Sequence, residues 1–432
     1  MNPLSSVIDA THGRGEPDAR RLLHRFLPLV DQTYGIVTVF AEEQDYFHDE
    51  PKWPMWRAEI GPTRLLSPGG YVRTVANGGR GFDLAAARVG AMFEAFERYN
   101  LALPDASRHV RASETELISR GESCLSVAEF LSYDTAARDD RRTTAERDRI
   151  RDWVEGRRSD GEPLLVPAQF VFVPFRETPE EPLLRDPLTT GAAAGLHRGA
   201  AIVRGMLEAV ERDGVMRLHY GALPAEAIDP APLVLDRELA ALRRHQLGVQ
   251  AVRIGSPFAA HVVAVLVTDR TGGRPRFTTG SCARLTLREA VLGALMEAVV
   301  YRRALRARLP GPADCYTAGI AADGIRCLED RAFYWQQDET TGHIDYLPWT
   351  PAGAADGSVE YDPVDLLRSI EAAGPVAYVD LGSPELTAAG VRTVKVVAPR
   401  LQPMYLNEEL ECVAAGTADS GWARPAHPHP FL

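Results

Sequence analysis

The sequence has few cysteines, and their pattern builds neither a disulfide framework nor a zinc site. Five cysteines are scattered over 432 residues without a C-x-x-C pair: Cys124, Cys282, Cys315, Cys327 and Cys412. An odd, scattered set is typical of reduced thiols. The chain also lacks an N-terminal apolar segment of signal-peptide length, and it has no run of about 18 apolar residues. We therefore expect a cytoplasmic protein without a membrane span.

A surplus of basic residues is missing as well. The 48 lysines and arginines face 59 aspartates and glutamates, which gives a net charge of −11. This balance argues against broad binding of nucleic acid or of an anionic membrane. No Walker phosphate-binding loop and no kinase motif set occurs. A metallohydrolase that uses acidic residues alone is weakly supported, because His197 and His219 stand isolated from any histidine cluster.

The composition is that of a globular protein with a full core. Apolar residues make up 45% of the chain and charged residues 25%. Strand-like segments interleave with three long helical patterns, which predicts an α+β fold with mixed sheets. We divide the chain into an N-terminal segment (1–60), a main domain (61–413) and a proline-rich tail (414–432). The charged stretch 138–158 predicts a solvated helix or a surface insertion.

Three predicted helices, at 83–100, 197–220 and 286–309, repeat one short motif. The unit is an apolar stretch, then E-A-x-x, then an arginine that comes one residue later in the third helix. The glutamates of the three helices are Glu94, Glu97, Glu208, Glu211 and Glu297. A single E-x-x-E-R helix is usually a solvated face. These glutamates are embedded in apolar residues and the motif recurs, so a shared site is favoured.

The spacing of the glutamates points to a cation. Glu94 and Glu97 lie on one helical face, where like charges cost a few tenths of a kcal/mol. A cation between the helices would reverse that cost, and Mg²⁺ prefers carboxylate oxygens completed by waters and phosphates. Arg98, Arg212 and Arg302 would meet phosphate oxygens through forked hydrogen bonds. Two small-residue segments before the first two helices, 77–81 and 191–195, would let backbone N–H groups approach phosphate.

With these motifs in this order, the chain resembles the YcaO family. The family's pattern has a Gly-rich loop with a basic residue, an E-x-x-E-R helix, a second small-residue loop, another E-x-x-E-R helix, and a third helix with a glutamate. The resemblance runs over about residues 65–305, and the stretch 376–404 is similar to the family's C-terminal region. It implies an ATP-binding cleft in which the five glutamates hold Mg²⁺. The implied nucleotide-binding residues are Arg80, Arg98, Thr190, Gly191, Arg212 and Arg302.

The resemblance also implies a reaction and its partners. Azoline-forming cyclodehydratases use ATP to phosphorylate a peptide amide oxygen as a Cys, Ser or Thr side chain attacks, and loss of phosphate leaves a thiazoline or oxazoline ring. The implied substrate is a ribosomal precursor peptide. The implied partners are a leader-binding ThiF-like protein and a separate flavin dehydrogenase for later oxidation. Neither nucleic acid nor membrane is expected as a partner, and the sequence leaves open whether the chain forms a homodimer.

The C-terminal tail narrows the resemblance to the azoline formers. Their chains tend to end in a P-x-P-x-P-like segment that reaches the active site, and this one ends in PAHPHPFL. Alternating prolines favour a stiff, extended tail. The resemblance implies proton transfer by His427, by His429 or by the carboxylate of Leu432.

Several polar positions of the family's nucleotide site are replaced in this chain. Arg80 stands for a lysine, Thr190 and Leu196 for asparagines, Ala200 for an acidic residue and Val300 for a glutamine. Two explanations stay open: an enzyme that binds ATP with fewer contacts, or a scaffold that binds peptide without ATP chemistry. A thioamide- or amidine-forming enzyme is a further alternative, against which the proline-rich tail argues.

Overall fold

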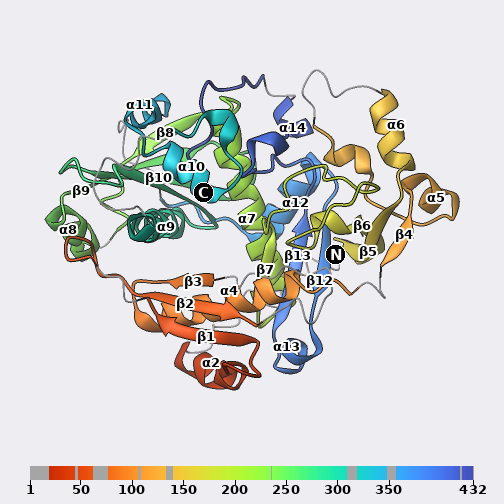
Figure 1. Ribbon diagram of the computed structural model, residues 1–432, viewed down its shortest axis with the longest axis horizontal. Coiled ribbons are helices and arrows are strands. Elements are labelled where there is room, and N and C mark those ends of the chain that lie inside the picture. Colours follow the sequence, from red (N-terminus) through yellow and green to blue (C-terminus); the bar gives the residue numbers. More distant parts are fainter. Residues whose placement is uncertain are drawn as a thin grey trace.

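The computed structural model describes residues 19–43, 47–61, 76–105, 109–132, 140–234, 236–308, 319–347, 357–418 and 421–431. It confirms the predicted α+β class, because antiparallel sheets pack against long helices. Three sheets surround a central helix, α7 (Arg198–His219), as Figure 1 shows. No helix in this described part of the chain is long and apolar enough to cross a membrane. Leu432 lies outside the described residues.

The strands pair in three sheets. Their orders are β1-β2-β3, β11-β10-β9-β8 and β4-β5-β12-β13-β7, and β6 pairs with β5. The bounds are β1 Val37–Glu42, β2 Met55–Ile60, β3 Ala76–Arg80, β4 Val110–Ala112, β5 Arg151–Arg158, β6 Pro163–Pro167, β7 Ala192–Gly195, β8 Ala225–Ile228, β9 Leu247–Ile254, β10 His261–Asp269, β11 Phe277–Arg284, β12 Ala377–Leu381 and β13 Arg392–Val397.

The three motif helices form where the sequence predicts them. They are α4 (Leu84–Leu101), α7 and α9 (Leu287–Arg308), each within one residue of the predicted bounds. Asp83 caps α4, since its Oδ1 accepts a hydrogen bond from the backbone N of Ala86 at 2.9 Å. The other helices are α2 Ala19–Phe26, α5 Glu114–Ser119, α6 Asp140–Asp148, α8 Asp236–Arg244, α10 Leu328–Tyr334, α11 Asp338–Thr341, α12 Pro363–Ala373, α13 Pro384–Ala388 and α14 Ala415–Ala418.

Each motif helix follows a strand that packs against it: β3 precedes α4, β7 precedes α7 and β11 precedes α9. The segments 77–81 and 191–195, which we predict as loops, are therefore largely strands. Glycines in the strands that precede the motif helices serve close packing. A Cβ on Gly79 would lie 1.9 Å from the carbonyl oxygen of Ala87 in α4, and one on Gly280 would lie 2.2 Å from that of Ala294 in α9.

The three strand–helix units close around one interior space. Helix α4 contacts β3 and β7, α7 contacts β7 and β11, and α9 contacts β11 and β3. Figure 1 shows α4 below, α7 at the centre and α9 beside it. This cyclic arrangement turns one face of each motif helix towards the same space.

The charged stretch 138–158 is not all surface, and our prediction is wrong for its second half. Helix α6 is followed by β5, which lies within the third sheet. Arg151 and Trp153 are fully buried there, and Arg151 Nη2 lies 2.9 Å from the carboxylate of Glu146. The sequence RDWVEGRR places apolar residues among charged ones at strand rather than helix spacing.

Candidate active site

A cavity of about 930 Å³ lies between α4, α7 and α9. Strands β3, β7 and β11 supply the rest of its wall. The structure brings to this cavity all five predicted glutamates and three of the predicted arginines. They are Glu94, Glu97, Glu208, Glu211, Glu297, Arg80, Arg98 and Arg212. We call this space the glutamate cavity.

On α4, one arginine lies between two glutamates. The guanidinium of Arg98 is 3.5 Å from the carboxylate of Glu94 and 3.5 Å from that of Glu97. Glu94 and Arg98 are four residues apart, so they share a helical face. Burial raises the pKa of Glu97 to about 8, with further contributions from the Glu208 and Glu94 carboxylates and opposition from Arg98.

On α7, the two glutamates are fixed by β11 and by the residue that precedes β7. The carboxylate of Glu208 accepts a hydrogen bond from the backbone N of Gly191 at 3.0 Å. Glu211 accepts from Ser281 Oγ at 2.9 Å and from the backbone N of Ala283 at 3.1 Å. Burial raises the pKa of Glu211 to about 7. Both side chains are therefore held in place before any ligand arrives.

On α9, Glu297 repeats the arrangement of Glu208. Its carboxylate accepts a hydrogen bond from the backbone N of Ser281 at 2.9 Å and lies 3.5 Å from the guanidinium of Arg80. In both units the helix glutamate thus binds a backbone N–H of the segment that precedes its own helix. The repeat in the sequence therefore corresponds to a repeated hydrogen-bond arrangement in the structure.

The glutamates form a row rather than a cluster. Within the described residues, no three acidic, histidine or cysteine side chains converge closely enough to hold a metal ion by themselves. Electrostatic contacts link Glu94 to Glu97, Glu97 to Glu208, Glu208 to Glu211 and Glu211 to Glu297. Mg²⁺ usually takes one or two carboxylates and completes its shell with waters and phosphates. The row fits this need, since the raised pKa values mark carboxylates whose charge is incompletely compensated.

The structure does not bring Arg302 to the glutamate cavity. Its Nε lies 2.8 Å from Glu50, its Nη2 lies 2.6 Å from Asp269, and its Nη1 donates to the carbonyl oxygen of Pro275 at 2.5 Å. The physical reason is helical rotation. Arg302 follows Glu297 by five residues, which turns it by about 140° from that glutamate, whereas a spacing of four keeps two residues on one face. Arg302 therefore forms buried ion pairs with Glu50 and Asp269.

Arg284 takes the place that we predict for Arg302. It lies at the end of β11, lines the glutamate cavity, and is in electrostatic contact with Glu211 and Glu297. The sequence reasoning missed Arg284 and Ser281 because β11 reads FTTGSCAR, a polar run without strand alternation. The place of this run in the chain could have revealed both residues, because it precedes the third motif helix just as β3 and β7 precede the other two.

Two further predicted residues take other positions. Gly191 lies at the glutamate row and donates its N–H to Glu208 rather than lining the cavity. Thr190 lines a second, smaller cavity of about 100 Å³. Leu196 and Ala200 line the glutamate cavity itself, so the replaced family positions leave part of its wall apolar.

A buried lysine that the sequence reasoning missed lies beside the row. Lys395 of β13 is 3% exposed, and its Nζ donates to the carbonyl oxygen of Leu188 at 2.7 Å. Burial lowers the pKa of Lys395 to about 8, and the nearby Glu208 and Glu97 carboxylates oppose that change. No local pattern in the sequence marks this lysine, because strand pairing brings it to α4 and α7 from far along the chain.

The C-terminal tail is packed into the protein. Residues 428–431 are buried, and Phe431 is only 1% exposed. Arg331 Nη1 and Trp335 Nε1 both donate to the carbonyl oxygen of His429, at 3.1 and 3.3 Å. Because these donors come from α10 and its end, a short helix anchors the tail at His429.

The tail contacts β11, one of the strands that line the glutamate cavity. Thr279 Oγ1 donates to the carbonyl oxygen of Pro430 at 2.7 Å. Thr279 and Ser281 lie two residues apart on β11 and therefore on one face of the strand. Since Ser281 holds Glu211, the tail and a glutamate are attached to neighbouring positions of one strand face.

The two tail histidines have different surroundings. His429 is fully buried, and its Nε2 donates to the carbonyl oxygen of Tyr405 at 2.7 Å. Burial lowers the pKa of His429 well below its ordinary value, so the ring stays neutral and suits an anchor better than a proton carrier. His427 is partly exposed, stacks on His343 at 3.9 Å, and its Nδ1 lies 2.9 Å from the hydroxyl of Tyr334.

Comparison with known families now bears on this geometry. Residues 78–402 match the sequence model of the family described as YcaO cyclodehydratase, ATP- and Mg²⁺-binding. The match covers most of the chain and includes all three motif helices. The chain belongs to the YcaO family. The comparison with curated proteins gives no match.

Solved structures show the YcaO fold as well. A heterocyclase in complex with substrate and cofactor is 18% identical with a TM-score of 0.72, and the match covers 97% of this chain and 58% of that one. YcaO from Methanopyrus kandleri, bound with AMPPCP and Mg²⁺, is 20% identical with a TM-score of 0.64, covering 91% and 93%. The E. coli microcin synthetase complex McbBCD is 14% identical with a TM-score of 0.56, covering 84% and 87%. The chain thus spans little more than half the length of the first heterocyclase.

The raised pKa of Glu97 in this YcaO protein predicts a pH-dependent stability. The ordinary value is 4.5, so the folded state retains a proton that the unfolded state releases. The resulting stability is present below about pH 4.5 and is lost as the pH rises through about 8. We expect the melting temperature of the unliganded protein to fall from pH 6 to pH 8, and to fall less in Glu97→Gln, which cannot ionise. Equal pH slopes for the two proteins in thermal denaturation would contradict this assignment.

Proposed function

We propose that this YcaO protein is an ATP-dependent cyclodehydratase that activates backbone amides of a ribosomal precursor peptide. In this proposal, Cys, Ser or Thr residues of the peptide become thiazoline or oxazoline rings. The observation that carries the proposal is the row of five glutamates in one cavity, bordered by arginines from α4, α7 and β11. Buried carboxylates without a cation are unfavourable, and the row suits Mg²⁺ together with a polyphosphate.

The residues of the chain have separate tasks in this reaction. When bound, ATP with Mg²⁺ supplies the phosphoryl group that turns the amide oxygen into a leaving group. Arg98, Arg212 and Arg284 would neutralise charge that develops on the phosphate oxygens. The substrate's thiol or hydroxyl attacks the amide carbon and loses its proton, the amide oxygen departs as phosphate, and the amide nitrogen loses its proton as the C=N bond of the ring forms. The peptide loses one water for each ring, and ATP becomes ADP and phosphate.

A second part of the proposal concerns proton transfer by the C-terminal tail. The hydrogen bond between Thr279 and Pro430 brings residue 430 to the face of β11 that also holds Glu211, and His427 is the tail histidine that solvent reaches. We infer that the tail transfers protons during ring closure. A carboxylate of Leu432 stays a proposal, because that residue lies outside the described part of the chain.

The substrate and partner proposals are supported by the solved neighbours. McbBCD is a complex of several proteins, and one of its structures contains pro-MccB17. We propose by analogy that this chain acts on a precursor peptide presented by a leader-binding, ThiF-like partner, with a separate flavin dehydrogenase for any oxidation. The fit of the glutamate row to Mg²⁺ favours an enzyme over an inactive scaffold.

The partner proposal predicts that the isolated protein is slow. Presentation by a second binding module raises effective substrate concentration, so we expect ring formation to accelerate by about 100-fold when a ThiF-like protein is added. Mass spectrometry of a cysteine-containing precursor peptide would count one lost water for each ring. Full conversion by the lone protein at the same rate would overturn the partner requirement. Absence of any water loss with the partner present would overturn the cyclodehydratase itself.

A further inference from the structure

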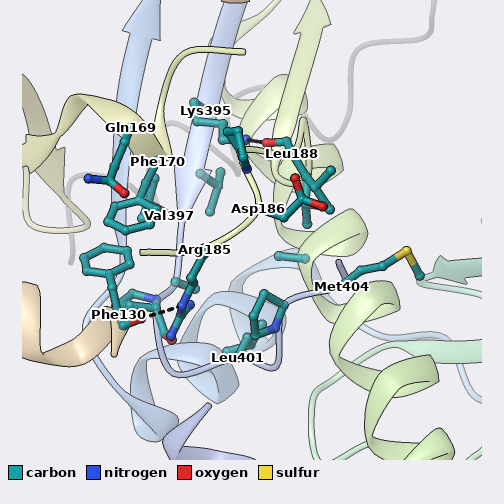
Figure 2. A pocket seen from close by; sticks show the side chains of 17 residues that line it. Phe130, Gln169, Phe170, Arg185, Asp186, Leu188, Lys395, Val397, Leu401 and Met404 are labelled. Atoms are coloured by element: carbon teal, nitrogen blue, oxygen red, sulfur yellow. Dashed lines mark hydrogen bonds between the residues drawn. The ribbon is translucent and has the colours of Figure 1, made fainter. Parts of the chain in front are cut away.

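The smaller cavity lies directly behind the glutamate row. It has a volume of about 100 Å³ and is shown in Figure 2, with Lys395 on one side, Phe130 and Phe170 on another, and Met404 on a third. The rings of Phe130 and Phe170 are stacked at 3.8 Å. One wall of the cavity is therefore aromatic.

The two cavities share their dividing wall. Ala209 lines the smaller cavity and follows Glu208, which lines the other. Met404 lines the smaller cavity, and its Sδ accepts a hydrogen bond from Nη1 of Arg212 at 3.2 Å. A group held in the smaller cavity would thus lie next to the arginine that we assign to phosphate.

Lys395 has unused donors in this wall. An ammonium carries three N–H donors, and among the described residues Nζ meets one hydrogen-bond acceptor, the carbonyl oxygen of Leu188. Its side chain is buried, lies within electrostatic reach of Glu97 and Glu208, and lines the smaller cavity. A buried ammonium with open donors requires an acceptor from a ligand or water.

The other charged groups of the lining are already occupied. Arg185 donates to the carbonyl oxygens of Phe130, Glu129 and Pro399. Asp186 accepts hydrogen bonds from the backbone N atoms of 406 and 407, at 2.7 and 3.2 Å. Of the charged groups in the lining, the lysine is therefore the one with donors left for a ligand, and a neutral carbonyl oxygen beside an apolar group matches it.

The volume limits the apolar group. A cavity of about 150 Å³ is known to hold a benzene ring, and this one is smaller, at about 100 Å³. The cavity therefore suits a short aliphatic or hydroxylated side chain and rejects an aromatic one.

We propose that the smaller cavity holds the peptide residue that precedes the cyclising Cys, Ser or Thr, and that Lys395 donates a hydrogen bond to the carbonyl oxygen of that residue. This inference rests on the proposed function, since it places the activated amide. In this placement the Lys395 ammonium stabilises the charge that develops on the carbonyl oxygen during attack. The preceding residue must then be small.

Methionine methyl resonances test this subsite directly. The protein has seven methionines, and a Met404→Leu variant identifies the Met404 signal. Two acetylated, amidated peptides are titrated with and without AMPPCP and Mg²⁺: Gly-Ala-Cys-Gly and Gly-Trp-Cys-Gly. We expect the alanine peptide to shift the Met404 signal saturably and the tryptophan peptide to bind at least about tenfold more weakly. Equal affinities, or a Met404 signal that neither peptide moves, would overturn the subsite.

Two variants separate the lysine from the cavity shape. Lys395→Met keeps the length of the side chain, and we expect it to weaken the alanine peptide by about tenfold to a hundredfold while AMPPCP still binds. Phe170→Ala enlarges the cavity and should admit the tryptophan peptide, an outcome that general loss of structure would not produce. Unchanged alanine-peptide affinity in Lys395→Met, or continued exclusion of tryptophan in Phe170→Ala, would overturn the assignment.

A separate calorimetric titration tests the proposed function. If AMPPCP with Mg²⁺ produces no heat of binding, the ATP-dependent reaction is excluded. The peptide-induced shift of Met404, recorded without nucleotide, still decides whether the smaller cavity binds peptide.

Discussion

Replacing Glu211 with glutamine is expected to abolish magnesium-dependent nucleotide binding without unfolding the protein. Glu211 lies between Glu208 and Glu297 in the glutamate row, where burial raises its pKa to about 7. Glutamine keeps an oxygen that accepts from the backbone N of Ala283 and an amide that donates to the Ser281 hydroxyl oxygen, but it removes the negative charge that would attract Mg²⁺. Removing even an outer group of a metal site weakens binding by about 10- to 100-fold, so we expect a loss of at least about 100-fold here.

Thermal denaturation with AMPPCP and Mg²⁺ measures this loss. At about 100 times the dissociation constant, ligand stabilises a protein by about 2.7 kcal/mol, and a 100-fold weaker site reduces this to about 0.4 kcal/mol. The unliganded variant should be no less stable than the wild type at about pH 8, because it removes a buried carboxylate that would otherwise be ionised there.

A buried glutamate elsewhere provides the matched control. Glu114 also accepts one hydrogen bond from a serine hydroxyl, Ser126 at 2.9 Å, and one from a backbone N, Val127 at 2.8 Å. Glu114→Gln should lower stability and leave nucleotide binding unchanged. Equal nucleotide stabilisation of Glu211→Gln and wild type would show that the row does not hold the nucleotide's metal.

Removing residues 427–432 is expected to abolish ring formation while nucleotide binding stays within about tenfold. The tail meets β11 at Thr279, on the strand face that also holds Glu211. Proton transfer by a placed group contributes about 10²- to 10⁴-fold to a rate, so its loss should stop detectable ring formation. The glutamate row does not depend on tail atoms, and calorimetry with AMPPCP checks that it still binds.

Truncation also removes the buried Phe431, which costs about 1.5–3 kcal/mol of stability. A pair of threonine variants avoids that loss. Thr279→Val removes the hydrogen bond to Pro430, whereas Thr278→Val removes one to the carbonyl oxygen of Ala298 in α9, on the opposite face of β11. We expect Thr279→Val to slow ring formation more than Thr278→Val does. Truncated protein that forms rings at the wild-type rate would remove the tail from the mechanism.

The sequence was sufficient for the parts of the site that depend on local helical periodicity. Glu94 and Glu97, or Glu208 and Glu211, are placed on one face by spacing alone, and their apolar neighbours predict burial. The same periodicity, applied to Arg302, would have excluded it, because five residues rotate a side chain away from Glu297. The prediction for Arg302 was wrong because we treated an arginine five residues after a glutamate as equivalent to one that follows by four residues.

The features of the site that the sequence could not predict depend on strand pairing. The Gly-rich segment before α4 looks like a phosphate loop, but Gly79 is small so that β3 can lie against α4. Arg284 sits in a polar strand without alternation. Lys395 reaches the glutamate row because β13 pairs with β7, a contact between segments about 200 residues apart in the chain. Long-range pairing of this kind leaves no mark in a single sequence.

The central claim is that the glutamate cavity binds ATP through Mg²⁺, and calorimetric titration of the full chain tests it most directly. ATP is titrated in the presence of Mg²⁺ and again in the presence of a chelator. We expect micromolar binding with Mg²⁺, which corresponds to a binding free energy of about −8 kcal/mol, and at least about tenfold weaker binding with the chelator. Absence of binding with Mg²⁺, or equal binding with the chelator, would contradict it.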